Sequence, residues 1–410
     1  MAIGTPGELL AIDLDPGPAW PELVRALWAD GVAFLPLDRR LTHRERRHVV
    51  DLARPAAVLD ETGETTLFAD PGPLSAGTRL VVATSGTTGQ PRLVELSGPA
   101  IEAAVTGSAE ALGAVTADPW VACLTPAHVG GMLVFLRGAL LGAPVIALER
   151  FDPDAILDAS AGTSGPAGRF FVSVVPAMVT RLIESGRDLS SVALLVGGGE
   201  LEPGVRRKAE ARGAAVVTTY GLTESAGGVV YDGRVIAGTD VRIDRSSATG
   251  VQAGDWSATE LGRIEMTGPT LMEGYLHDPA ATGAAFTTDG WLRTGDAGQL
   301  KDDGTLVVHG RLGDVIRTGG ETVWPREVER ALRDHPKVAD VAVAGRPHPD
   351  WGSQVTAFVV PTDRTDPPSL DELRNHAAET IARFKAPREL VLVEELVRTS
   401  SGKLRRTDLP

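Results

Sequence analysis

The sequence predicts an α/β fold, with a large N-terminal domain of α/β subdomains and a small β-rich subdomain, followed by a small α/β C-terminal domain. Three observations predict it. Apolar runs alternate with amphipathic segments of helical period up to about residue 233, which is typical of α/β domains. Residues 234–310 hold short strand-like segments separated by Gly and Asp turns. Helix–strand alternation returns over residues 314–410, and a chain of 410 residues is long enough for two domains or more.

The first elements follow directly from the residue pattern. Amphipathic segments predict helices over residues 21–31 and 44–55, and apolar runs predict strands over residues 32–37 and 56–60. The same criteria apply to the middle of the chain. They predict helices over residues 99–115, 132–142 and 177–186, and strands over residues 80–83, 119–126, 144–149, 169–176, 191–196 and 214–219.

The later elements are shorter. Within the β-rich segment we expect strands over residues 235–244, 262–268, 274–278, 290–300 and 305–310. In the C-terminal part we expect helices over residues 327–336 and 370–387, and strands over residues 339–347, 354–361 and 388–396.

The composition excludes several classes of function. Hydrophobic residues make up 43% of the chain and charged residues 23%, as in a globular protein with sizeable cores. The formal net charge is −14 and no lysine-rich run occurs, so nucleic-acid backbone binding is excluded as the main activity. We expect no membrane span, because no apolar stretch reaches the roughly 18–20 residues that a span needs.

Two features bear on the compartment. The N-terminal segment lacks the basic start and long apolar core of a signal peptide. The single cysteine, Cys123, allows no intrachain disulfide, and its apolar neighbours predict a buried thiol. Both features favour a cytoplasmic protein.

A loop rich in glycine and hydroxyl groups follows the strand predicted over residues 80–83. It consists of Thr84, Ser85, Gly86, Thr87, Thr88 and Gly89, and the basic residue Arg92 comes shortly after it. Glycines let backbone N–H groups approach an anion and the hydroxyls add donors, so the loop is suited to hold a polyphosphate. It lacks the spacing of a Walker loop, which needs Gly, four residues and then Gly-Lys-Ser/Thr. A polar surface turn is the alternative interpretation.

A second polar segment begins at the end of the strand predicted over residues 214–219. Tyr220 can stack on an adenine ring, and Thr223 can donate a hydrogen bond to a phosphate. Glu224 offers the hard oxygen ligand that Mg²⁺ prefers together with phosphate oxygens. Thr219 and Gly221 belong to the same segment. For Glu224 the alternative is a solvated loop carboxylate.

Two more strand ends carry candidate binding residues. His128 follows the strand predicted over residues 119–126, and open α/β sheets bind ligands at the carboxyl ends of their strands. The alternative is a strand-end histidine with satisfied hydrogen bonds. The strand predicted over residues 191–196 ends in three glycines followed by Glu200, and these glycines would let a flat ring lie against the backbone.

The loop TSGTTGQPR (84–92) resembles the TSGTTGxPK signature of the acyl-adenylate-forming enzymes, which include acyl- and aryl-CoA ligases, adenylation domains and luciferases. Later segments are similar to further motifs of this family, in the family's order. They are YGLTE (220–224), WLRTGD (291–296), GRLGD (310–314), IRTGGE (316–321) and RTSSGK (398–403). The resemblance implies an enzyme that uses ATP, Mg²⁺ and CoA to activate a small carboxylic acid through an acyl-AMP.

The resemblance also implies a role for individual residues. Asp296 would accept the ribose hydroxyls, and Arg311 would contact ribose and phosphate. Gly319 and Gly320 would line the tunnel for the pantetheine arm of CoA, and Lys403 would contact the carboxylate and the α-phosphate during adenylation. The predicted catalytic residues are Lys403, His128, Thr223 and Glu224, the last also as the metal ligand. The predicted nucleotide- and CoA-binding residues are Thr84, Ser85, Gly86, Thr87, Thr88, Gly89, Arg92, Gly198, Gly199, Glu200, Thr219, Tyr220, Gly221, Asp296, Arg311, Gly319 and Gly320.

The acyl site has expected members as well. In the family, the position of His128 lines the acyl pocket, and we expect the pocket around His128, Gly130, Gly131, Gly198 and Gly228, with Met132 and Val229 near its ends. No cation for a second substrate carboxylate can be assigned from the sequence.

The domain boundaries follow from the same resemblance. It implies an N-terminal adenylation domain over residues 1–311 with a shortened first subdomain, a hinge over 312–314, and a mobile C-terminal domain over 315–410. The sequence departs from the family pattern at four positions. Arg92 and Arg317 replace lysines, Leu93 replaces a glycine, and Gly313 replaces a polar hinge residue.

The segment that follows Glu224 narrows the resemblance. Gly227-Gly228 and the VVYDG run over 229–233 are similar to the o-succinylbenzoate–CoA ligases of menaquinone biosynthesis. Three alternatives stay open: a ligase for another aryl or acyl acid, an adenylating enzyme that loads a carrier-protein thiol, and a nucleotide-binding protein without turnover. Whether the chain forms a homodimer is also open.

Overall fold

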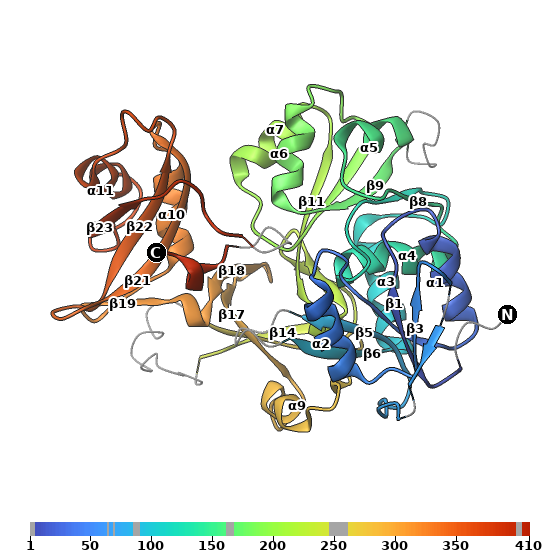
Figure 1. Ribbon diagram of the computed structural model, residues 1–410. Helices are drawn as coiled ribbons and strands as arrows, with labels where there is room; N and C mark the ends of the chain where they lie inside the picture. Colours follow the sequence, from blue (N-terminus) through green and yellow to red (C-terminus); the bar gives the residue numbers. More distant parts are fainter. Residues whose placement is uncertain are drawn as a thin grey trace. The chain divides into compact units, whose positions relative to one another are not determined.

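The computed structural model describes residues 5–63, 65–68, 70–84, 91–160, 168–245, 261–398 and 404–410. The chain forms two compact units, shown as a ribbon in Figure 1. The first unit comprises Met1–Asp240 and Thr267–Leu292, and the second unit comprises Val241–Met266 and Arg293–Pro410. Both units combine sheets with helices, so the predicted α/β class is confirmed.

The first sheet of the first unit is mixed, with parallel central strands and antiparallel pairings toward both edges. Its strands are β1 (Leu9–Asp13), β2 (Ala33–Pro36), β3 (Ala57–Asp60), β4 (Thr65–Leu67), β5 (Thr78–Thr84), β6 (Arg92–Ser97) and β16 (Gly274–Tyr275). They lie in the order β16-β6-β5-β2-β1-β3-β4. Strands β5, β2, β1 and β3 are parallel to one another, whereas β4 and β6 pair antiparallel with their neighbours.

The second sheet of the first unit is parallel over most of its width. Its strands are β7 (Trp120–Ala122), β8 (Val145–Ala147), β9 (Phe170–Val174), β10 (Val192–Val196), β11 (Ala215–Leu222), β12 (Gly227–Tyr231) and β13 (Arg234–Val235). They lie in the order β13-β12-β11-β10-β9-β7-β8. The sheet becomes antiparallel at β12, directly after the polar segment that the sequence analysis singled out.

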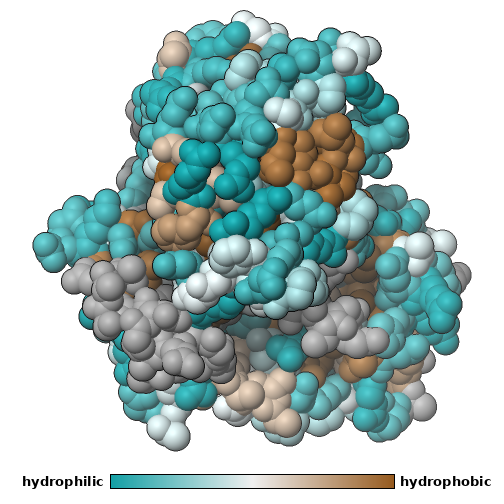
Figure 2. Space-filling view, turned by 90° about the vertical axis from the view of Figure 1, so that its left-hand side faces the viewer, coloured by the Kyte–Doolittle hydropathy of each residue, from teal (hydrophilic) through white to brown (hydrophobic). Residues whose placement is uncertain are grey.

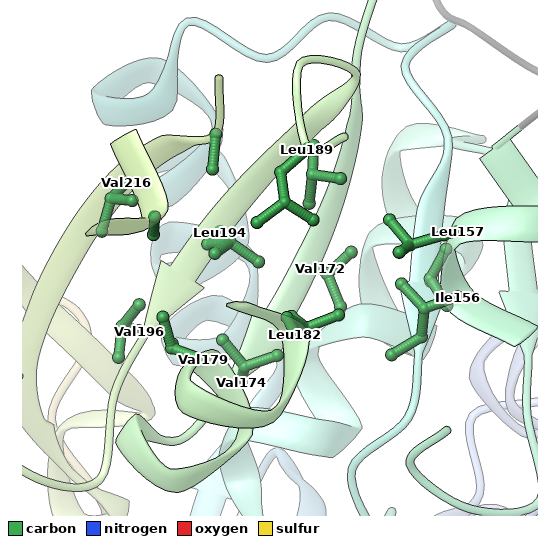
Figure 3. Close-up of a cluster of buried hydrophobic side chains, with 14 of the residues drawn as sticks. Ile156, Leu157, Val172, Val174, Val179, Leu182, Leu189, Leu194, Val196 and Val216 are labelled. Carbon is green, nitrogen blue, oxygen red and sulfur yellow. The ribbon is translucent and has the colours of Figure 1, made fainter. Parts of the chain in front are cut away.

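Helices cover these sheets. They are α1 (Trp20–Ala29), α2 (His43–Ala53), α3 (Gly98–Leu112), α4 (Val129–Leu141), α5 (Pro153–Ser160), α6 (Pro176–Glu184), α7 (Pro203–Ala211) and α9 (Pro279–Ala285). Helices α5, α6 and α7 bury an apolar core against β9, β10 and β11, which Figure 3 shows through Val179, Leu182 and Leu194. Strands buried in this way read as continuous apolar runs, which is why the sequence predicted them.

Helix α4 is apolar on nearly every side because it lies between other elements. It packs against α1, where the rings of Trp20 and Phe135 are 5.9 Å apart. The helix begins directly after His128, whose carbonyl accepts from the N–H groups of Gly131 and Met132 at 3.0 and 2.9 Å. The buried neighbour Cys123 has its pKa raised to about 12 by burial, as expected for an unreactive thiol.

The second unit contains two smaller sheets. The first consists of β14 (Asp240–Asp244), β15 (Gly262–Thr267), β17 (Leu292–Leu300) and β18 (Leu306–Arg311). The second consists of β19 (Ile316–Thr318), β20 (Glu321–Val323), β21 (Val338–His348), β22 (Gly352–Pro361) and β23 (Glu389–Leu392). Helices α10 (Pro325–Arg333) and α11 (Leu370–Ala378) share a buried apolar core with this second sheet.

Several sequence predictions are wrong in detail. The strand expected over 235–244 is interrupted, since β13 ends at Val235 and β14 begins at Asp240. The strand expected over 274–278 is only Gly274–Tyr275, and it belongs to the first sheet of the first unit, where Tyr275 pairs with Val94. Local pattern cannot reveal such a distant partner. The helix expected over 370–387 ends at Ala378. After it the N–H groups of Glu379 and Thr380 bond back by three residues, to His376 O at 3.2 Å and Ala377 O at 3.0 Å, before a single four-residue bond from Ile381 to Ala377 O.

Two further predictions concern the organisation of the chain: that no segment spans a membrane, and that residues 312–314 form a hinge. No helix in the part of the chain that the structure describes is long and apolar enough to cross a membrane. Hydrophilic residues cover most of the face in Figure 2, interrupted by smaller apolar patches. The segment 312–314 forms a single 3₁₀ turn, and its role as a hinge between domains of 1–311 and 315–410 stays a prediction.

Candidate active site

The predicted polyphosphate loop connects two neighbouring strands of the first sheet. Thr84 is the last residue of β5, Arg92 is the first residue of β6, and the two pair in register. The Thr84 hydroxyl donates to the Arg92 carbonyl at 3.3 Å. The predicted residues Ser85, Gly86, Thr87, Thr88 and Gly89 lie outside the described residues. The exposed side chain of Arg92 and the buried side chain of Leu93 show that the strand resumes immediately after the loop.

The segment that carries Thr223 and Glu224 is a 3₁₀ turn between β11 and β12, η1 (Thr223–Ser225). The buried hydroxyl of Ser225 accepts from the Leu222 N–H at 2.9 Å and donates to the Gly227 carbonyl at 2.9 Å. The backbone then reverses at Ala226, which has a positive φ of 50°. The turn therefore holds Glu224 at a fixed place beyond the end of the sheet.

Glycines near this turn are needed for packing. A Cβ at Gly221 would lie 1.8 Å from the Gly227 carbonyl oxygen, so only glycine fits where β11 and β12 cross. A Cβ at Gly197 would lie 2.9 Å from the Thr219 Oγ1, and one at Gly228 would lie 3.2 Å from the Thr219 Cβ. The structure thus brings Thr219 and Gly221 of β11 together with Gly197, directly after β10, and with Gly227 and Gly228 at the start of β12.

The other predicted residues of this loop system are accessible. Gly198, Gly199 and Glu200 follow β10 and are exposed, and Gly198 has a positive φ of 76°. Tyr220 is half-buried on β11 and lies next to Gly221, where the strand register shifts. Nothing in the structure tests whether these residues contact a nucleotide, so their assignment stays a prediction.

Glu224 has a partner that the sequence analysis missed. The hydroxyl of Tyr275 donates to Glu224 Oε1 at 2.8 Å, and Tyr275 is 8% exposed. Burial and the neighbouring Glu224 carboxylate raise the pKa of Tyr275, so the phenol keeps its proton and stays a donor. Tyr275 is 51 residues away in sequence, and no local pattern signals the contact.

His128 also has an unpredicted partner. Arg40 Nη2 lies 2.8 Å from His128 Nε2, and the same guanidinium bonds Asp38, with Nη2 2.7 Å from Oδ2. Asp38 is 9% exposed. Burial raises the pKa of the Asp38 carboxyl, but the hydrogen bonds from Arg40 outweigh burial and leave it below its usual value.

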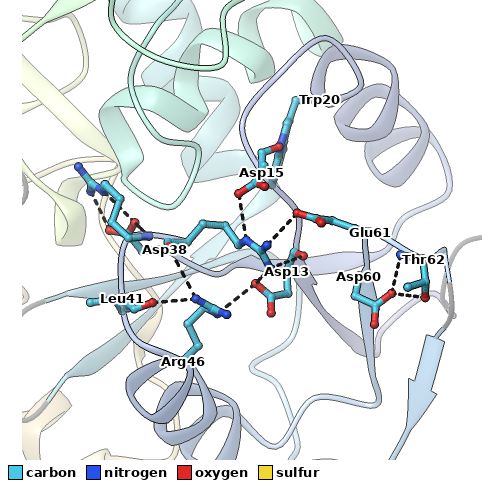
Figure 4. Close-up of polar contacts among 11 residues, drawn as sticks. Asp13, Asp15, Trp20, Asp38, Leu41, Arg46, Asp60, Glu61 and Thr62 are labelled. Carbon is cyan, nitrogen blue, oxygen red and sulfur yellow. Dashed lines mark hydrogen bonds and ion pairs between the residues drawn. The ribbon is translucent and has the colours of Figure 1, made fainter.

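A larger polar cluster fixes the segment that carries Asp38 and Arg40. The neighbouring Arg39 bonds the carboxylates of Asp13, Asp15 and Glu61 at 3.0, 3.0 and 2.8 Å. Figure 4 shows these carboxylates converging at the ends of β1 and β3. The cluster ties the loop after β2 to the ends of β1 and β3, and thereby places Arg40 beside the start of α4.

The glycines after His128 include one that is sterically required. A Cβ at Gly131 would lie 2.1 Å from the Thr125 carbonyl oxygen, whereas a Cβ at Gly130 would meet nothing within 4 Å. Met132 and Val229 are fully buried. Of the predicted pocket members, Gly131 thus lets the chain turn into α4, and Gly130 leaves open space beside it.

In the second unit, Asp296 and Arg311 form an ion pair across β17 and β18. Their Cα positions pair in register, and Arg311 Nε lies 2.9 Å from Asp296 Oδ1. Asp296 is 6% exposed. A Cβ at Gly295 would come within 2.9 Å of Arg311 Nη1, so the glycine leaves room for the guanidinium. Two residues that the sequence analysis predicted from separate motifs are therefore joined directly in the structure.

Gly319 and Gly320 form the turn between β19 and β20, with positive φ angles of 59° and 86°. The Gly319 N–H donates to the Trp351 carbonyl at 3.0 Å, and a Cβ at Gly319 would lie 2.7 Å from Trp351 Cε3. Trp351 is 39% exposed, and the Arg388 guanidinium lies 4.1 Å from its ring centroid. The sequence analysis missed Trp351. The usable signal in the sequence was a tryptophan directly before a glycine, and its exposure is a finding of the structure.

Lys403 lies outside the described residues. On either side of it, Arg398 and Leu404 form an antiparallel bridge, and Arg398 Nη2 lies 2.7 Å from Asp340 Oδ2. Both ends of the predicted lysine loop are therefore anchored to the second unit.

The donor set of the first unit fits a metal that arrives with phosphate. Among the described residues, no group of three or more His, Cys, Asp or Glu side chains could hold a metal by itself. Glu224 has one oxygen engaged by Tyr275, and its other oxygen is a hard ligand of the kind that Mg²⁺ combines with phosphate oxygens. Glu224 is thus suited to hold Mg²⁺ bound to a nucleotide.

Comparisons with known proteins agree with this chemistry. The family model of the AMP-binding enzymes matches residues 77–276, and that of the AMP-binding enzyme C-terminal domain matches residues 327–403. A probable 2-succinylbenzoate–CoA ligase of Mycobacterium tuberculosis is 36% identical over 339 residues, covering 80% of this chain and 83% of the relative. The 2-succinylbenzoate–CoA ligase of Listeria monocytogenes is 31% identical over 408 residues, covering 94% of this chain and 85% of the relative.

Solved structures of similar proteins extend over almost the whole chain. The o-succinylbenzoate CoA synthetase (MenE) of Bacillus subtilis, in complex with the acyl-adenylate OSB-AMP, has a TM-score of 0.84 and 26% identity, covering 98% of this chain and 88% of that chain. ATP-bound MatB of Rhodopseudomonas palustris has a TM-score of 0.84 and 25% identity, with the same coverage. The predicted resemblance is confirmed, and the chain belongs to the family of AMP-binding enzymes.

Proposed function

We propose that this enzyme is an ATP-dependent 2-succinylbenzoate–CoA ligase of menaquinone biosynthesis. The observation that carries the proposal is similarity along nearly the whole chain. The Listeria monocytogenes ligase matches 94% of it at 31% identity, and the Bacillus subtilis synthetase that was solved with OSB-AMP matches 98% at 26% identity. The substrates would be the carboxylic acid, ATP and CoA, with Mg²⁺ as the cofactor.

The reaction has two halves. In the first, an oxygen of the substrate carboxylate attacks the α-phosphorus of ATP, the bond to the bridging oxygen breaks, and pyrophosphate leaves. In the second, the CoA sulfur attacks the acyl carbon of the acyl-AMP, and AMP leaves. Bound Mg²⁺ would neutralise phosphate charge during the first half.

We assign the phosphate side to residues of the first unit. The 84–89 loop and Arg92 would hold the polyphosphate, Thr223 would donate to it, and Glu224 would hold Mg²⁺. The anchored positions of Thr84, Arg92 and Glu224 at the ends of β5, β6 and β11 support this assignment. Arginine keeps the charge of the lysine it replaces but changes donor geometry, so we expect altered pyrophosphate handling instead of inactivity.

The remaining roles are assigned to other parts of the chain. Tyr220 with Gly198, Gly199, Glu200, Thr219 and Gly221 would bind adenine. Asp296 would accept the ribose hydroxyls with Arg311 beside it, a role that the ion pair between buried Asp296 and partly exposed Arg311 supports. Lys403 would stabilise charge on the α-phosphate, and Gly319 and Gly320 would guide the CoA arm. Between the two half-reactions, the 315–410 segment would rotate about 312–314. This movement would withdraw Lys403 and bring the CoA thiol to the acyl-AMP.

The acid is proposed to lie beside His128, where Gly130 leaves space. The buried thiol of Cys123 is compatible with a cytoplasmic site of action, which we include in the proposal. A homodimer stays a hypothesis that sedimentation velocity would test.

The test is pyrophosphate release by the purified protein with Mg·ATP and a panel of acids: o-succinylbenzoate, benzoates and medium-chain fatty acids, each with and without CoA. We expect release with o-succinylbenzoate, CoA-dependent turnover, and loss of release in Lys403→Ala. Turnover with a different acid would move the enzyme to another pathway. If acyl-AMP forms without CoA and its acyl group passes only to a carrier-protein thiol, that thiol is the acceptor in place of CoA. If no acid leads to pyrophosphate release, a nucleotide-binding protein without turnover is favoured.

A further inference from the structure

Tyr275 lies between two side chains of the proposed phosphate site. Its hydroxyl donates to Glu224 Oε1 at 2.8 Å. On its ring, the guanidinium of Arg92 lies 5.1 Å from the centroid, within the range of a cation–π contact. One buried tyrosine therefore contacts both the proposed metal ligand and the cation next to the phosphate loop.

The backbone around Tyr275 is held on two sides. Gly274 and Tyr275 pair antiparallel with Glu95 and Val94 of β6, the strand that begins at Arg92. On the other side, the Tyr275 N–H donates to Thr282 Oγ1 at 2.9 Å. Tyr275 therefore has a fixed position relative to the strand that ends the phosphate loop.

The Glu224 turn is tied to the same segment by a second bond. The Met272 N–H donates to the Glu224 carbonyl at 2.9 Å. With the Tyr275 hydroxyl, this makes one backbone bond and one side-chain bond between the 272–275 segment and a single residue of η1. The bond from the Met272 N–H fixes the backbone of Glu224, whereas only the Tyr275 hydroxyl contacts the Glu224 carboxylate.

We infer that Tyr275 is a positioning residue for Mg·ATP: its hydroxyl orients the Glu224 carboxylate so that one oxygen faces the metal, and its ring supports Arg92. The inference rests on the proposed function, because it needs Glu224 as the metal ligand. A carboxylate rotates freely about its last bond in solution, and a donor on one oxygen removes that freedom before the metal binds. Outer hydrogen-bond partners of metal ligands are typically worth about 10- to 100-fold in metal affinity or activity.

The two contacts of Tyr275 can be separated. Tyr275→Phe removes the bond to Glu224 and keeps the ring under Arg92. Tyr275→Leu removes both contacts. Thr282→Val is the matched control, because it removes the side-chain hydroxyl on α9 that accepts from the Tyr275 N–H and leaves the Tyr275 hydroxyl in place.

The experiment measures binding, with Mn²⁺ as the probe and a non-hydrolysable imido analogue of ATP. Free Mn²⁺ is followed by electron paramagnetic resonance in titrations of each variant, and analogue affinity is measured separately without metal. We expect Tyr275→Phe to weaken Mn²⁺ binding roughly tenfold or more, with unchanged analogue affinity. Tyr275→Leu should weaken both, and Thr282→Val should lower thermal stability but keep wild-type Mn²⁺ affinity.

A second variant tests the contact from the other side. Glu224→Asp is one CH₂ shorter and loses the hydroxyl contact, so adding Tyr275→Phe to it should cause no further loss of Mn²⁺ affinity. Additive losses, or wild-type Mn²⁺ affinity in Tyr275→Phe, would overturn the inference while leaving the proposed function intact. If the wild-type protein bound neither the analogue nor Mn²⁺ with it, both the proposed function and the inference would be wrong.

Discussion

The guanidinium of Arg40 donates a hydrogen bond to the imidazole of His128, with 2.8 Å between Nη2 and Nε2, although the two residues are 88 positions apart in the sequence. Arginine has only donors, so Nε2 must be the acceptor and the ring proton must lie on Nδ1. The contact therefore selects the neutral Nδ1–H tautomer of His128. Asp38 Oδ2 lies 3.7 Å from the same nitrogen and would favour a proton on Nε2 if Arg40 were absent.

This relationship predicts the effect of Arg40→Met. Without the arginine donor, the ring proton of His128 is free to move to Nε2 and donate to Asp38 Oδ2, so the fraction of the Nδ1–H tautomer should fall and the KM for the acid should change. Long-range ¹H–¹⁵N spectra of the imidazole report the tautomer directly, with His128→Gln used to assign the signal. Arg47→Met is the matched control, because the exposed Arg47 lies on α2 and pairs with Asp51, outside the cluster that holds the loop after β2. An unchanged tautomer in Arg40→Met would contradict the prediction.

The lowered pKa of Asp38 predicts a pH dependence of stability. The folded pKa lies below the unfolded value of about 3.9, so the carboxylate stabilises the fold above that value, and the contribution is lost as pH falls through the folded pKa. Asp38→Asn should therefore lower the free energy of unfolding at pH 7 by about 2 kcal/mol, as expected for hydrogen bonds to a charged group. Urea unfolding at pH 7 and below pH 4 measures the gap, which should shrink in acid. A gap that stays constant with pH would show that the charge has no part in it.

The Asp296–Arg311 pair predicts a defect specific to the nucleotide. Asp296→Ala should raise the KM for ATP by roughly 10- to 100-fold, because hydrogen bonds to a charged group are worth about 1.5–3 kcal/mol. The KM for the acid should change little. Asp302→Ala, at an exposed aspartate between β17 and β18, is the control and should behave as wild type. Equal effects of both substitutions on ATP would argue against the ribose role.

Trp351 predicts a separation of the two half-reactions. Its exposed ring packs against Gly319 and carries Arg388 at 4.1 Å, so we expect it to form part of the CoA path. Trp351→Ala should raise the KM for CoA at least several-fold and leave the single-turnover formation of acyl-AMP unchanged. Trp28→Ala removes a tryptophan with a similar arginine contact in the first unit, at 4.3 Å, and should leave the KM for CoA unchanged. A loss of acyl-AMP formation in Trp351→Ala would contradict the assignment.

The sequence by itself determined the fold class, the family and most of the elements. Buried parallel strands are continuous apolar runs, and this pattern was enough to predict β9 and β10, whereas β11, which is mostly half-buried, was predicted from its β-branched residues. The motif residues were found because phosphate, ribose and metal each require particular side chains at short spacing. Such requirements are local, so a linear sequence carries them.

Only the tertiary structure decided which distant side chains act on these motifs. Tyr275 reaches Glu224 because Gly274–Tyr275 adds a short edge strand to β6, and Arg40 reaches His128 because the polar cluster fixes the loop after β2 beside α4. The sequence analysis placed Tyr275 in a β-rich segment and did not single out Arg40. A two-residue strand or a loop arginine has no periodicity of its own, and its partner is set by packing across the sheet. For this reason the sequence identified the reacting groups, while the contacts that orient them emerged only from the folded chain.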